Sequence, residues 1–257
     1  MPKTKTIAKG LLAVPAIPAL AAGVMYAQVK RQAHRKDLPS HTNQDPSGTF
    51  GDPAKPTLRI VALGDSSITA PGVEPLDACF ARRVALHLTD RYFVDLISVA
   101  VGGSKSRDVL GEQVEAALQH HPDLALISVG ANDALRGTPV SRFEHELDQI
   151  VGRLHPHVGA LVLMGVGDLG TVPRLPASVR ALVTWRSKLF DDAAERVVSE
   201  YPRVTKADNW RHDPDPFATR DLALFASDQF HASAQGHEVF AARVIPAADR
   251  AVKFLDF

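Results

Sequence analysis

Three residue types that together can activate a serine occur in this chain in the order Ser, Asp, His. Residues 64–67 read Gly-Asp-Ser-Ser, and residues 228–231 read Asp-Gln-Phe-His. A serine hydroxyl becomes a good nucleophile when an imidazole takes its proton and a carboxylate fixes the tautomer of that imidazole. The spacing of Asp228 and His231 puts both side chains on one side of a single turn. The sequence therefore predicts Ser66 as a nucleophile, with His231 as its base and Asp228 as the residue that orients the base.

The composition is that of an ordinary globular protein. The chain has 257 residues, a length that indicates one domain or at most two. Of these residues 45% are apolar, and the formal net charge is zero. The neutral balance argues against nucleic acid as a general partner, because phosphate contacts need clustered lysines and arginines. With Cys79 as the one cysteine, an intramolecular disulfide is ruled out. No Cys/His cluster has zinc-site spacing, so we expect no metal.

Residues 1–29 are expected to direct the chain to a membrane rather than to join the fold. Three lysines precede an uncharged run over residues 10–29, which is about long enough to cross a bilayer core. Basic residues flank both ends of the run, so their distribution does not decide its orientation. The Ala-Leu-Ala at residues 19–21 also fits a signal-peptide cleavage site. A membrane anchor and a cleaved signal peptide both stay open, with the anchor preferred.

Residues 30–56 are polar, rich in Pro, Gly, Asp and Ser, and without apolar periodicity. This composition is typical of a flexible linker that holds a folded domain, here 57–257, away from the membrane. We therefore expect an exported protein, either anchored by its N-terminal segment or secreted to the cell envelope.

From residue 57 onward, short apolar runs alternate with longer amphipathic stretches. The runs predict five strands, at 58–63, 93–99, 124–129, 161–166 and 204–207. The stretches predict helices at 77–90, 106–119, 141–155, 177–200 and 234–254, and Ser141 with Glu144 has the spacing of a capping box. Strands that are apolar on both faces and separated by helices imply a parallel sheet covered on both sides. We expect a three-layer α/β/α sandwich that binds ligands at the carboxyl ends of its strands.

Two further motifs follow predicted strands. Residues 101–104 read Val-Gly-Gly-Ser, and paired glycines let a backbone N–H approach a ligand closely. Residues 130–133 read Gly-Ala-Asn-Asp, which could point the amide of Asn132 at the same edge. Taken alone, the glycines could form a plain turn, and Asn132 could be a helix N-cap. The run at 64–67 could also be a plain or phosphate-binding turn, but its glycine spacing fits neither a Rossmann fingerprint nor a P-loop.

Together and in this order, the motifs resemble the SGNH (GDSL) hydrolase family. The family name records a Ser, a Gly, an Asn and a His, which match Ser66, Gly103, Asn132 and His231 here. The resemblance covers about residues 58–245. It implies a flavodoxin-like, five-stranded parallel sheet and a serine carboxylic ester hydrolase, esterase- or lipase-like, that needs no cofactor.

This chain departs from the family pattern at two positions. The first block usually continues with Leu where this chain has Ser67, and the second often begins with Asn where it has Ser98. Neither change touches the nucleophile position. The Gly-x-Ser-x-Gly elbow of the α/β-hydrolases does not occur, which disfavours that fold.

The resemblance also implies an oxyanion hole. Its donors would be the backbone N–H groups of Ser66 and Gly103 and the side-chain amide of Asn132. The two adjacent glycines leave the register open, so Gly102 is the alternative to Gly103. Asp65 neighbours the nucleophile rather than the histidine, and we interpret it as a structural hydrogen-bonding residue.

Three loops and several phenylalanines are the sequence features that bear on the substrate. We expect the pocket to be walled by loops 70–75, 167–176 and 210–225, and phenylalanines could line an acyl or alcohol site: Phe217, Phe225 and Phe230. No large lid is evident, which favours small or short-acyl esters. An exported position makes cell-envelope esters or acetylated glycans reasonable substrates. The alternatives are an SGNH-type O-acyltransferase, a carbohydrate O-deacetylase or a non-catalytic envelope binding protein, and we expect a monomer.

Overall fold

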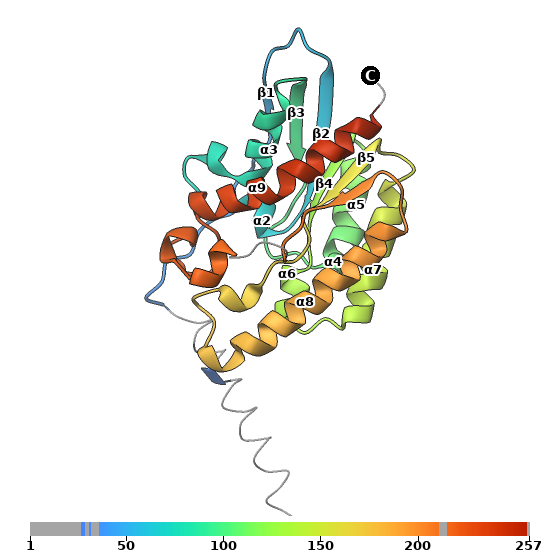
Figure 1. Ribbon diagram of the computed structural model, residues 1–257. Helices are drawn as coiled ribbons and strands as arrows, with labels where there is room; N and C mark the ends of the chain where they lie inside the picture. The colour runs from blue at the N-terminus through green and yellow to red at the C-terminus, as the bar shows by residue number, and fades with distance from the viewer. Residues whose placement is uncertain (1–26, 29–30, 32–35, 211–214, 256–257) are drawn as a thin grey trace, which may run out of the picture.

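The centre of the molecule is a six-stranded sheet between two layers of helices (Figure 1). The computed structural model describes residues 27–28, 31, 36–210 and 215–255. The predicted membrane-directed segment, 1–29, lies outside the described residues except for 27 and 28. Among the helices of the described residues, none combines the length and the apolar character needed to span a membrane.

The sheet has the strand order β1-β3-β2-β4-β5-β6. The strands are β1 (Gly48–Phe50), β2 (Thr57–Gly64), β3 (Phe93–Ser98), β4 (Leu124–Ser128), β5 (Ala160–Leu163) and β6 (Val204–Lys206). All neighbours are parallel except β1, which pairs antiparallel with β3 at the edge. The five parallel strands have the chain order 2-1-3-4-5, which is the flavodoxin-like arrangement. The predicted fold class is therefore confirmed.

Strand β1 was not predicted. It lies within the segment interpreted as a flexible linker, and neighbouring residues also bind the domain. Gln44 donates from its side chain to the carbonyls of Ala70 and Val73, and the Ser47 hydroxyl accepts from the N–H of Ser98. The linker prediction is therefore wrong for the residues from Gln44 to Phe50. A three-residue strand is too short to produce a recognisable alternation of apolar and polar residues.

Helices cover both faces of the sheet, because alternate strand residues point to opposite sides. Ile60 and Ala62 of β2 pack into the core under α3 (Phe80–Leu88) and α9 (Ala234–Ala251). Val61, from the same strand, packs into the opposite core. The helices of that second face are α5 (Val114–Leu118), α7 (Val140–Leu154) and α8 (Ala177–Ser199). Three short helices come after β2, β3 and β4 in the chain: α2 (Ser66–Thr69), α4 (Ser106–Asp108) and α6 (Ala131–Leu135). The three-layer prediction is confirmed.

The start of α7 differs from the predicted capping box. The helix begins at Val140, with Pro139 as its N-cap and no capping side chain. Glu144 instead accepts two hydrogen bonds of 2.7 Å from the guanidinium of Arg196 on α8. Because proline already has a backbone angle suited to a helix entry, the helix starts before Ser141 and that hydroxyl falls inside the first turn. The capping-box prediction is wrong.

Gly64 at the end of β2 brings the predicted nucleophile turn against β4. Its φ is +142°, and a Cβ placed there would lie 1.9 Å from the carbonyl oxygen of Ser128. A side chain would therefore push the two strand ends apart. The next N–H, that of Asp65, donates to the same Ser128 oxygen at 3.1 Å. The turn that carries Ser66 is thus fixed at the carboxyl edge of the sheet.

Candidate active site

Ser66 is the first residue of α2, directly after β2. Asp65 caps this helix, because its Oδ1 accepts from the N–H of Ser67 at 3.0 Å. Its Oδ2 accepts from Nδ2 of Asn132 at 3.1 Å. Burial raises the pKa of Asp65, although hydrogen bonds from Ser67 and Asn132 and the charge of His231 oppose this effect. Asp65 has the structural role that the sequence predicted: it ties the Ser66 turn to Asn132.

Asp228 and His231 form a hydrogen-bonded turn. The Oδ1 atom of Asp228 accepts from the backbone N–H groups of Phe230 and His231, at 2.9 and 3.0 Å. Its Oδ2 lies 2.6 Å from Nδ1 of His231. Burial alone would raise the pKa of Asp228, but these hydrogen bonds and the nearby imidazole bring it down to about 2. The carboxylate is therefore ionised at neutral pH and binds one ring nitrogen of His231, which leaves Nε2 for another partner.

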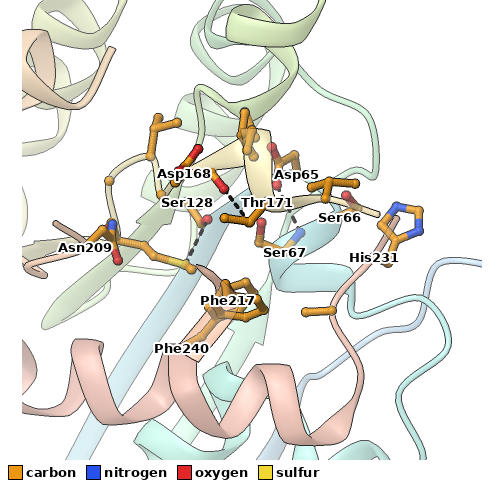
Figure 2. Close-up of a pocket in the computed structure, with 18 of the residues that line it drawn as sticks. Asp65, Ser66, Ser67, Ser128, Asp168, Thr171, Asn209, Phe217, His231 and Phe240 are labelled. Carbon is orange, nitrogen blue, oxygen red and sulfur yellow. Dashed lines mark hydrogen bonds between the residues drawn. The ribbon is translucent and has the colours of Figure 1, made fainter. Parts of the chain in front are cut away.

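Ser66, Asn132 and His231 line the same pocket, with a volume of about 130 Å³. Figure 2 shows Ser66 next to the ring of His231 at one end of this pocket. Among the described residues no hydrogen bond joins Ser66 to His231, and in unliganded enzymes such a bond often tightens only when substrate binds. Asp228 lies behind His231, away from the pocket. The three predicted residues thus converge at the carboxyl edge of the sheet.

The predicted glycine donor of the oxyanion hole does not line the pocket. Neither Gly102 nor Gly103 is among the described residues that line the pocket. The 101–104 turn is held from both sides: a Cβ at Gly102 would meet the Asn43 side chain at 2.0 Å, and the carbonyl of Gly103 accepts from Arg136 at 3.2 Å. In the described part of the chain, the backbone N–H groups of Ser66 and Gly103 donate to no acceptor.

Most of the predicted walls line the pocket. Residues 167–169, 171 and 172 do so, as do the three predicted phenylalanines: Phe217, Phe225 and Phe230. Loop 70–75 does not, because the segment before β1 covers it. His41 bonds to Ser227 at 3.0 Å, and its ring would meet a Cβ at Gly72. Residues 211–214 of the third loop lie outside the described residues.

Sequence reasoning missed the contribution of α9 to the pocket. His237, Phe240 and Arg243 all line it. Their three-residue spacing places them near one another along the helix surface. A sequence pattern could have indicated them, because His237 and Arg243 are polar residues in a helix whose other buried residues are mostly small and apolar. Asn209, which follows β6, was also missed.

His237 should make stability depend on pH. Its Nδ1 accepts from the N–H of Phe80 at 3.1 Å. Burial, assisted by the charges of Arg83 and His231, lowers its pKa from 6.5 to about 3. Between these values the unfolded chain binds more protons than the folded one. The free energy of unfolding should therefore fall as the pH is lowered through this window, by up to about 1.4 kcal/mol per pH unit.

The measurement is urea unfolding at pH 7.5 and pH 5, compared between the natural chain and His237→Asn. The asparagine oxygen can still accept from Phe80 but does not titrate. We expect the natural chain to lose about 2 kcal/mol more than the variant over this interval. Equal losses in the two proteins would show that His237 is not held neutral by the fold.

Comparison with known proteins places the chain in a family. Residues 62–239 match the GDSL-like Lipase/Acylhydrolase family. A GDSL-like esterase of Mycobacterium tuberculosis is 28% identical over 191 residues, a match that covers 72% of this chain and 59% of that protein. This chain thus spans about three fifths of that relative's length.

Solved structures show the same fold at low sequence identity. The crystal structure of TesA matches with a TM-score of 0.62 and 17% identity, over 75% of this chain and 99% of that one. LAE5, an α/β hydrolase enzyme from the metagenome of Lake Arreo in Spain, matches with a TM-score of 0.60 and 20% identity, over 79% and 98% of the two chains. The resemblance predicted from the four sequence motifs is confirmed, and the chain belongs to the GDSL-like lipase/acylhydrolase family of esterase-type hydrolases.

Proposed function

We propose that this protein is a serine carboxylic ester hydrolase that forms its acyl-enzyme on Ser66. The observation that carries the proposal is the 2.6 Å contact between the ionised Asp228 and Nδ1 of His231, at a pocket that Ser66 and His231 both line. A carboxylate, an imidazole and a hydroxyl in this relation are the groups that nucleophilic catalysis on an ester needs.

The reaction begins with attack of the Ser66 hydroxyl oxygen on the ester carbonyl. Nε2 of His231 takes the hydroxyl proton, and the carboxylate of Asp228 stabilises the imidazolium that forms. His231 then gives this proton to the leaving alcohol, and the acyl group stays on Ser66. His231 then takes a proton from a water molecule, which attacks the acyl carbon, and returns that proton to the oxygen of Ser66 as the acid leaves.

The negative charge on the carbonyl oxygen needs hydrogen-bond donors. The N–H groups of Ser66 and Gly103 have no acceptor within the described residues, and Nδ2 of Asn132 uses one of its two hydrogens on Asp65. We assign the two backbone N–H groups and the second Asn132 hydrogen to the oxyanion. Each such donor contributes about 3 kcal/mol to the transition state.

We propose small or short-acyl esters as substrates. The pocket volume of about 130 Å³ lies below the roughly 300–1,000 Å³ typical of sites for drug-sized ligands. We also propose that the chain is exported, with residues 1–29 as a membrane anchor in preference to a cleaved signal. This second proposal rests on the uncharged run between basic residues in the sequence.

A chain-length series of p-nitrophenyl esters, from acetate to dodecanoate, tests the function. We expect hydrolysis with the highest kcat/KM among the short acyl chains and a free acid as product. Preferential formation of a new ester when an alcohol is added would instead indicate an acyltransferase. Failure to turn over any ester in the series would contradict the proposal.

A further inference from the structure

The pocket continues away from the triad to an end lined by polar side chains. Arg243, Asn209 and Asp215 line the pocket together with Phe217 and Phe240. Two of them are almost fully buried, with 6% of Arg243 and 3% of Asn209 exposed. Buried polar groups normally have hydrogen-bond partners, so unused groups here point to a ligand.

Arg243 has the largest unused capacity. Its Nη2 donates to Oδ1 of Asp215 at 2.5 Å, and its guanidinium lies 5.8 Å from the centre of the Phe217 ring. A guanidinium carries five N–H donors. No other residue in the described part of the chain accepts a hydrogen bond from it. Because Arg243 lines the pocket, its remaining donors are available to a group bound there.

Asn209 has an unused acceptor as well. Its Nδ2 donates to the carbonyl of Met164, whereas its Oδ1 receives no hydrogen bond from the described residues. The region thus offers both free donors and a free acceptor.

The register of α9 places Arg243 at the far end. The helix starts just after His231 at the carboxyl edge and runs back along β6, where Thr205 donates to the carbonyl of Ala247 at 3.0 Å. Arg243 lies one turn earlier on α9 than Ala247, and it lines the same pocket as Asn209, which follows β6. Figure 2 shows Asn209 and His231 at opposite ends, with Phe217 and Phe240 between them.

The direction of catalysis assigns this end to the acyl group. His231 must give a proton to the leaving alcohol, so the alcohol lies on the His231 side. The side chain of His231 is 26% exposed, which opens that side to solvent. The acyl group then extends the other way, past Phe217 and Phe240, to Arg243.

The charges of Arg243 and Asp215 decide which kind of group on the acyl chain can bind at this end of the pocket. Asp215 pairs with Arg243, so the region has no net charge from this pair. A carboxylate at this end would be attracted by Arg243 but repelled by Asp215. A neutral oxygen, such as a keto or hydroxyl group, can accept from Arg243 without that repulsion.

Resting on the proposed function, we propose that the preferred acyl group carries a neutral keto or hydroxyl oxygen near its far end, and that Arg243 binds this oxygen. Asn209 completes the site. Arg243 is thus a specificity-determining residue that acts several bonds away from the reacting carbonyl.

The test compares three pairs of p-nitrophenyl esters: 4-oxopentanoate with pentanoate, 5-oxohexanoate with hexanoate, and 6-oxoheptanoate with heptanoate. In the natural protein, kcat/KM should favour the oxo ester about tenfold or more in at least one pair, as expected for one hydrogen bond from a charged donor. In the double variant Arg243→Met/Asp215→Asn, which removes both charges together, this ratio should fall to roughly one.

Arg82→Met is the matched control, because Arg82 also pairs with an aspartate but lies outside the pocket. It should leave the ratio unchanged, and melting curves check that all variants fold. The inference would be overturned, with ester hydrolysis still standing, by an unchanged ratio in a folded double variant or by no oxo preference in the natural protein. It would also be overturned if the natural protein preferred the p-nitrophenyl ester of monoadipate, which ends in a carboxylate, over the oxo esters. Absence of hydrolysis of every ester would instead reject the proposed function itself.

Discussion

The Ser66→Ala variant should hydrolyse a p-nitrophenyl ester at least about a thousandfold more slowly than the natural protein. The methyl side chain cannot form the acyl-enzyme, so only binding and the oxyanion donors remain. The fold should be unaffected, because no hydrogen bond of the Ser66 hydroxyl holds the described structure together. Steady-state kcat, with a melting curve for each protein, is the measurement.

Ser67→Ala is the sharpest comparison for this variant. The two serines are adjacent, and the backbone N–H of Ser67, which the substitution keeps, is bound to Asp65. We expect Ser67→Ala to lower kcat by less than about tenfold. If the two variants lost activity equally, or if Ser67→Ala lost more, Ser66 would not be the nucleophile.

Asp228→Asn should lower kcat by about ten-thousandfold, the size of effect known for this substitution in a serine-protease triad. An asparagine amide can donate to Nδ1 of His231, which would place the ring proton on Nε2. A protonated Nε2 cannot accept the Ser66 proton. The asparagine oxygen can still accept from the N–H groups of Phe230 and His231, so the turn should be kept.

Asp65→Asn is the matched control, since Asp65 is also a buried carboxyl beside the site. It binds Asn132 rather than His231, and an asparagine oxygen can still accept from the N–H of Ser67. The substitution should therefore act mainly on the Asn132 donor and cost about a hundredfold or less. A loss at Asp65 equal to the loss at Asp228 would mean that the carboxylate partner of the base has been misassigned.

The sequence predicted the strands and the Asp228–His231 turn correctly, because each of these local patterns is compatible with a single structure. The apolar runs at 58–63 and 124–129 became buried parallel strands, because they are apolar on both faces and separated by helices. The three-residue spacing of Asp228 and His231 became a single hydrogen-bonded turn. The order of the strands then brought Ser66 to the same edge.

The capping box, strand β1 and the role of Arg243 were not predicted correctly, and each failure has a physical cause. Ser141 and Glu144 have the spacing of a capping box, but the same segment also allows an entry through Pro139, and pairing of Glu144 with Arg196 requires knowledge of the α7–α8 packing. Strand β1 exists because it adds to the edge of β3, a long-range pairing that no local pattern encodes. The polar end of the pocket depends on where α9 lies over β6, so Arg243 could not be assigned from its own neighbours.

The most direct measurement is to label the protein with a fluorophosphonate and locate the adduct by tandem mass spectrometry. Fragmentation between residues 66 and 67 distinguishes the two hydroxyls. We expect one phosphonyl group on the oxygen of Ser66, with labelling lost in Ser66→Ala and strongly slowed in Asp228→Asn. A folded protein that takes no label, or that carries it on any other residue, would contradict the proposed nucleophile.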